Sequence, residues 1–143
     1  MQPIDPHTLF SIFEKGDEEI YKEHASLEAL KNPFVLMGTV LRGIENYYLM
    51  DVMYARSYPD EYKKVRKLTK LKYFNNLFRY LKKIDISNPD RVYRIGESFD
   101  KESTVQGLDV LRVFYEKLEH YEKCAVIKKY IDLVTTSPKL TFL

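Results

Sequence analysis

The apolar residues between Pro33 and Arg56 recur with the period of an α-helix over about six turns, and no other feature constrains the fold so strongly. They line one face of a helix and are Met37, Val40, Leu41, Ile44, Tyr47, Tyr48, Val52 and Ala55. Asn32-Pro33 marks the boundary before this helix. Gly38 and Gly43 each cost a helix about 1 kcal/mol relative to Ala. We therefore expect a long core helix against which another helix packs closely at the glycines.

Start and stop signals divide the rest of the chain into further elements. Asp5-Pro6 can start a short helix that Gly16 ends, and Asp17 can cap a second helix that runs to about Lys31. Residues 91–95, RVYRI, fit either an extended piece or one helical turn. Turns, linkers or loops are expected where proline, glycine and polar residues gather, at 57–60, 85–90 and 96–103.

A helical hairpin is expected over residues 104–134. Its apolar stripe begins at Leu108 and moves nearly to the opposite side of the helical wheel after Tyr121. One straight helix cannot bury two opposite stripes, so the phase change predicts a tight turn at residues 119–121.

The second arm of this hairpin, YEKCAVIKKYIDLV, resembles the UVR motif, a short helical hairpin found in excision-repair proteins and some chaperone adaptors. Within 111–134, the motif's aromatic, Glu, second Ala, Leu and Ile positions are held by Tyr121, Glu122, Ala125, Ile127 and Ile131. Lys128 replaces the usual Arg, and Lys129 reverses the charge of the usual Asp. The resemblance implies a protein-protein contact through Tyr121, Glu122 and Lys128, and no catalysis.

Together these signals predict an all-α fold, a compact bundle of about five to six helices with a C-terminal helical hairpin. A chain of 143 residues is about one domain. We therefore expect residues 1–143 to form a single helical domain. Residues 135–143 form a proline-containing tail that is expected to be frayed or docked in a groove.

Tyr62 to Ile84 is the most biased segment of the chain. It holds nine Lys or Arg, five aromatic residues and no Asp or Glu. An ordinary surface helix usually intersperses Glu among its Lys. The apolar residues of its first half lie on a different face from those that follow Tyr73. Because a straight helix cannot bury both faces, we expect a break near 69–72 or one half outside the core.

The charges of the chain are segregated along the sequence. Residues 1–60 carry 5 basic and 10 acidic side chains, residues 61–94 carry 11 and 3, and residues 95–143 carry 7 and 8. Two interpretations stay open. The basic helix faces a polyanion or an acidic partner, or the acidic N-terminal helices neutralise it within the fold.

Asp51 falls in the middle of the apolar stripe of 33–56. A lone buried charge is very costly. We therefore expect a buried Arg, Lys or tyrosine hydroxyl to hold this carboxylate. The alternative is a functional acid, but no second carboxylate is placed to work with it.

No catalytic or metal-binding constellation has sound spacing. The five Gly are scattered, so no Gly-rich phosphate loop is present, and the three His lie far apart. Glu116, His120 and Cys124 would share a face only on a continuous helix, and the predicted turn separates them. Cys124 fits an ordinary buried thiol. We expect a protein that is not an enzyme and has no catalytic residue, metal or other cofactor.

The compartment signals are few. One cysteine cannot form an internal disulfide, and the N-terminus lacks the basic and apolar regions of a signal peptide. Residues 34–55 are interrupted by charged side chains and are too polar for a bilayer span. We expect a cytoplasmic protein, and a membrane is not the expected partner.

Two functions from different classes remain. The first is a nucleic-acid- or nucleoprotein-associated accessory factor, in which Tyr73 and Tyr80 stack on bases if they are exposed. The second is a protein-protein adaptor or a homo-oligomeric assembly subunit whose basic helix pairs with acidic surfaces. In either case the contact residues are Lys63, Lys64, Arg66, Lys67, Lys70, Lys72, Arg79, Lys82 and Lys83.

Overall fold

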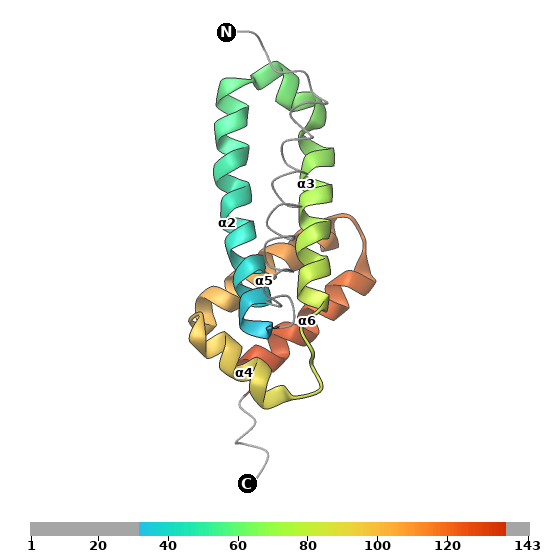
Figure 1. Cartoon of the computed structure of the whole chain (residues 1–143). Helices are drawn as coiled ribbons and strands as arrows, with labels where there is room; N and C mark the ends of the chain where they lie inside the picture. Colours follow the sequence, from blue (N-terminus) through green and yellow to red (C-terminus); the bar gives the residue numbers. More distant parts are fainter. Residues whose placement is uncertain (1–31, 137–143) are drawn as a thin grey trace.

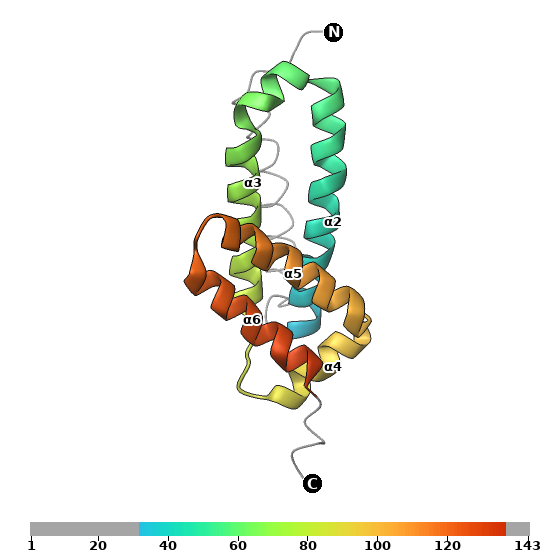
Figure 2. The same cartoon turned by 180° about the vertical axis from the view of Figure 1, so that it is seen from behind.

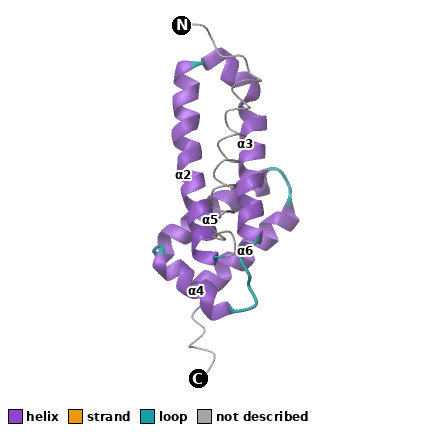
Figure 3. Ribbon diagram, viewed as in Figure 1, coloured by secondary structure: helices purple, strands orange, loops and turns teal. Residues whose placement is uncertain are grey.

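The computed structural model describes residues 32–136, which form five α-helices and no strand (Figures 1 and 3). The all-α prediction is therefore confirmed. The helices predicted before residue 32 and the tail beyond residue 136 lie outside the described residues. The five helices are α2 (Pro33–Ser57), α3 (Pro59–Lys82), α4 (Pro89–Ser98), α5 (Lys101–Lys117) and α6 (Tyr121–Thr135).

Helices α2 and α3 form a long antiparallel hairpin (Figure 1). The Asn32 side chain accepts a hydrogen bond from the Phe34 amide at 2.9 Å, which caps α2 ahead of Pro33. Tyr58 alone separates the two helices, at the predicted turn. The long helix expected from the apolar spacing is confirmed.

Helix α3 runs without interruption, so the predicted break near residues 69–72 is wrong. The alternative, that one half lies outside the core, is confirmed. Tyr62 is fully buried in a small cluster of its own with Met50, Tyr54, Ala55 and Val65. A single helix thus contributes to two clusters, both of which contact Tyr73, and this accounts for its two apolar faces.

The segment after α3 is more helical than predicted. Residues 91–95 belong to a ten-residue helix, α4, and residues 96–103 are not a loop, because α4 and α5 meet at Phe99 and Asp100. Tertiary packing explains the difference. A Cβ atom on Gly96 would lie 2.4 Å from Cγ1 of Val134, so α4 approaches α6 closely at this glycine.

Helices α5 and α6 form the predicted hairpin. Their turn spans residues 118–120, within a residue of the expected position. Glu119 adopts a left-handed conformation with φ of 60°, and the His120 amide donates to the Tyr115 carbonyl at 2.9 Å. This pair is the usual way to end a helix, although glycine is the residue that favours the left-handed position.

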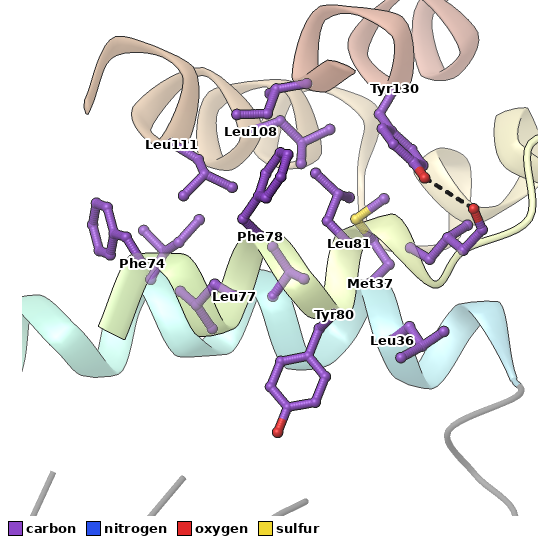
Figure 4. Packing of buried hydrophobic residues seen from close by; sticks show 14 of the residues in the cluster. Leu36, Met37, Phe74, Leu77, Phe78, Tyr80, Leu81, Leu108, Leu111 and Tyr130 are labelled. Atoms are coloured by element: carbon purple, nitrogen blue, oxygen red, sulfur yellow. Dashed lines mark hydrogen bonds between the residues drawn. The ribbon is translucent and has the colours of Figure 1, made fainter. Parts of the chain in front are cut away.

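The main core lies between the α2–α3 hairpin and the α5–α6 hairpin (Figure 4). Phe78 of α3 points toward Leu108 of α5, and the Tyr130 hydroxyl donates to the Ile84 carbonyl at 2.9 Å. The expected close packing at the α2 glycines is confirmed: a Cβ on Gly43 would lie 2.4 Å from Cδ2 of Leu77, and one on Gly38 3.2 Å from the Phe99 ring.

Helices α4, α5 and α6 surround only one end of the long hairpin (Figures 1 and 2). The second half of α2 and the first half of α3 project beyond them. The described helices are therefore less compact than the predicted bundle, and the projecting half carries much of the basic stretch.

Candidate nucleic-acid interface

Helix α3 confines its acidic residues to its first turn. Pro59, Asp60 and Glu61 start the helix, where carboxylates favour the helix dipole. Every charged side chain of α3 after Glu61 is basic. The local sequence thus builds one helix whose surface beyond its first turn is positive.

Besides Arg66, which is exposed but paired with Asp51, seven of the nine predicted basic residues are exposed. Lys63 and Lys67 lie on the same face of α3 as Phe74, by the helical register. Phe74 packs against Phe114 of α5, with the two ring centroids 4.7 Å apart. The outer side carries most of the others. The exposed set is Lys63, Lys64, Lys67, Lys72, Arg79, Lys82 and Lys83.

Arg66 has a structural partner instead of an open position. Its Nε and one terminal nitrogen donate to the two oxygens of Asp51 at 2.9 and 2.6 Å. The Tyr62 hydroxyl donates to the same carboxylate at 2.6 Å, and the Tyr47 hydroxyl lies 3.4 Å from it. This confirms the prediction that an Arg or a tyrosine hydroxyl pairs with the Asp51 carboxylate.

The electrostatics of this network follow from burial. Asp51 is 7% exposed, and burial alone would raise the pKa of its carboxyl. The hydrogen bonds from Arg66 and Tyr62 outweigh that effect, so the pKa of Asp51 lies below its ordinary value. Burial and the adjacent carboxylate raise the pKa of Tyr62 and of Tyr47. Asp51 therefore stays charged and paired at neutral pH, which favours its structural role over that of a functional acid.

Lys70 is half-buried among aromatic rings. Its Nζ lies 5.5–6.0 Å from four ring centroids, which belong to Phe114, Phe74, Tyr48 and Tyr47. Burial lowers the pKa of the Lys70 amine, Lys117 and Arg66 lower it further, and Asp51 opposes the shift. Rings of this kind attract a cation through their faces.

Lys70 and Lys117 border a pocket of about 250 Å³ between α2, α3 and α5. Tyr48, Phe114 and Asp109 also line it. Two ammonium groups beside two rings suit an anionic group such as a phosphate. Sequence reasoning missed Lys117, because only tertiary packing brings it next to Lys70.

The two tyrosines predicted to stack on bases are packed within the fold. The Tyr80 side chain is 5% exposed, so it does not meet the exposure that stacking requires. Tyr73 is half-buried, with its ring centroid 5.4 Å from that of Tyr47. This surface therefore offers cations and not rings, which suits contacts with phosphates.

The residues of the UVR-like hairpin lie on α6. Tyr121, Glu122 and Lys128 are all exposed, whereas Ile127 is buried in the core. Their accessibility is compatible with a protein contact. Their partner role stays a prediction.

The structure separates the three residues that the sequence offered as a metal-binding trio. Glu116 lies in the last turn of α5, His120 lies in the turn, and Cys124 is half-buried on α6. The predicted turn therefore separates the three residues. Within residues 32–136, no three His, Cys, Asp or Glu side chains are placed to hold a metal ion. No helix in the same range combines the length and apolar character needed to cross a membrane.

Comparison with known proteins adds no family. No protein-family model, curated protein or solved structure matches the chain. The candidate interface therefore stands on the geometry and charge of α3.

Proposed function

We propose that the protein binds the phosphate backbone of a nucleic acid through the exposed basic side chains of α3. One observation carries the proposal. Besides Arg66, helix α3 and its C-cap carry seven exposed Lys or Arg, and no acidic residue follows the first turn of the helix. Nucleic acids attract such surfaces because each neutralised phosphate releases condensed counterions.

The basic surface is long enough to meet several phosphates. Lys64 and Lys82 are 18 residues apart, which corresponds to about 27 Å along a helix axis. Phosphates of one strand recur about every 3.4 Å along a duplex. The surface therefore spans roughly eight nucleotides and supports several phosphate contacts at once.

The chemistry supports affinity without a sequence preference. Phosphate contacts position a nucleic acid, whereas base edges and stacking supply specificity. Tyr73 and Tyr80 are packed within the fold, and the exposed donors of α3 are cationic. The proposed activity is that of an accessory factor that follows the backbone.

The test is fluorescence anisotropy of a labelled 20-nucleotide single strand and of its duplex, titrated with the full chain at several salt concentrations. The variant is Lys63→Glu/Lys67→Glu, in which both side chains are exposed on the projecting half of α3. The matched control is Lys128→Glu/Lys129→Glu, an equal charge change at two exposed positions of α6.

We expect micromolar binding at low salt that weakens steeply as salt rises. The α3 variant should bind at least tenfold more weakly, and its salt slope for the single strand should be shallower by roughly 1.4, about 0.7 for each lost phosphate. Absence of binding at low salt, or an equal loss in the α6 control, contradicts the proposal and leaves an acidic protein as the partner to test.

A further inference from the structure

We propose that two copies of this chain pair through the outer face of the second half of α2, antiparallel about a two-fold axis that passes between Met50 and Asp51. The contact is isologous, with the same patch contributed by both copies.

The outer face of α2 carries a stripe of exposed apolar side chains. Leu49 is 71% exposed, Met53 53%, Val52 48% and Tyr48 42%. The spacing of Leu49, Val52 and Met53 places them on one side of the helix, opposite Tyr47 and Asp51, which are buried toward α3. Tyr48 borders this side, and its ring centroid lies 5.3 Å from that of Tyr47. Exposed apolar residues are ordinary when scattered, but a contiguous patch indicates a contact surface.

Among the helices that the structure describes, none covers this stripe. Helices α4 and α5 pack around the first half of α2, where Gly38 meets Phe99 and Gly107 meets Leu41. The second half of α2 projects beyond them (Figures 1 and 2). In an antiparallel pair, the body of each copy lies past the hairpin tip of the other, so the two bodies do not collide.

Charge complementarity identifies the occupant as a second copy. Glu45 is exposed one turn before the stripe, and Arg56 is exposed one turn after it. The two-fold axis that brings Leu49 opposite Val52 of the second copy also brings Glu45 opposite Arg56 of the second copy. The dimer then holds two Glu45–Arg56 pairs. A parallel pairing would instead place Glu45 beside Glu45 and Arg56 beside Arg56.

The inference is independent of nucleic-acid binding. Leu49, Val52 and Met53 lie on the side of α2 opposite Tyr47 and Asp51, which are buried toward α3. A dimer formed through these three residues leaves the outer basic side chains of α3 uncovered. The failure of either proposal leaves the other standing, because the dimer is tested without an oligonucleotide.

The test is sedimentation velocity of the full chain from about 2 to 300 µM. We expect a reversible shift from 17.0 kDa toward twice that mass, with a dissociation constant on the order of 10 µM, since one helix pair is a small interface. Leu49→Asp should weaken the dimer at least tenfold. Leu68→Asp is the matched control, because Leu68 is 51% exposed on α3, outside the stripe.

A charge exchange tests the register. Glu45→Arg alone and Arg56→Glu alone should each weaken the dimer severalfold, and the double variant Glu45→Arg/Arg56→Glu should restore it. Circular dichroism checks that each variant stays helical. A monomer at every concentration, a dimer that Leu49→Asp leaves intact, a dimer that Leu68→Asp breaks equally, or a double variant that stays weak would each overturn the proposal.

Discussion

The Asp51 network gives the sharpest test of how the projecting half of the hairpin is held together. Asp51→Asn keeps the size of the side chain and one acceptor oxygen, which can still serve the Tyr62 hydroxyl. It replaces the second oxygen, which accepts from Arg66 at 2.6 Å, with an amide donor. The variant therefore removes the ion pair while leaving the packing intact.

The expected cost follows from the exposure of the two partners. A hydrogen bond to a charged group contributes about 1.5–3 kcal/mol. Arg66 is 52% exposed, so solvent screening reduces its share to about 1 kcal/mol. Lower desolvation of the neutral amide offsets part of the loss. We expect Asp51→Asn to lower the free energy of unfolding by about 1 kcal/mol, out of a typical total of 5–15 kcal/mol.

The assay is urea unfolding followed by circular dichroism. The control is Asp109→Asn, whose carboxylate is half-exposed and whose partner Arg112 keeps a second ion pair with Glu116. That control should cost less than about 0.5 kcal/mol. If both variants lose the same amount, Asp51 is not the partner that joins α2 to α3.

The same network predicts a pH dependence. Because the folded pKa of Asp51 is lowered, its contribution is fully present above the unfolded value, about 3.9, and is lost as pH falls through the folded pKa. The stability difference between the wild-type protein and Asp51→Asn should therefore shrink below about pH 4. A difference that stays constant down to pH 2 would refute the assignment.

Two backbone positions give further tests by thermal and urea unfolding. Glu119→Gly should raise the free energy of unfolding by about 1 kcal/mol, because Glu119 holds a left-handed conformation that glycine adopts without strain; a loss of stability would contradict this. Gly43→Val should lower the free energy of unfolding by about 2–3 kcal/mol, because even a Cβ atom there would lie 2.4 Å from Leu77. An unchanged unfolding midpoint would show that α2 and α3 can separate freely.

Local signals predicted the parts of the fold that they control. The apolar period fixed α2, the phase change after Tyr121 located the α5–α6 turn, and the cost of a buried charge identified the kind of partner that Asp51 has. Helix α4 was missed because Gly96 and its polar neighbours suggest a loop. Contact with Val134, far along the chain, adds to the local cap that Asn88 and Pro89 provide.

The sequence predicted where the basic surface lies, but not which side chains are exposed on it. Lys67 and Lys70 are three residues apart, yet one is exposed and the other is half-buried among rings. The difference arises because α2 and α5 place Tyr48 and Phe114 over Lys70. The same long-range packing adds Lys117 and buries Tyr80, and no local pattern specifies either.

The projecting half of the hairpin reverses part of the usual distribution of side chains. Asp51 and Thr69 are buried between its helices, whereas Leu49 and Met53 face outward. The small cluster around Tyr62, the hydrogen bonds to Asp51 and the Asp51–Arg66 ion pair together join the two helices there. The outward stripe contributes to stability only when a second surface covers it. If a second copy does so, the unfolding midpoint rises with protein concentration by mass action, and Leu49→Asp removes that dependence while leaving the Asp51 network in place.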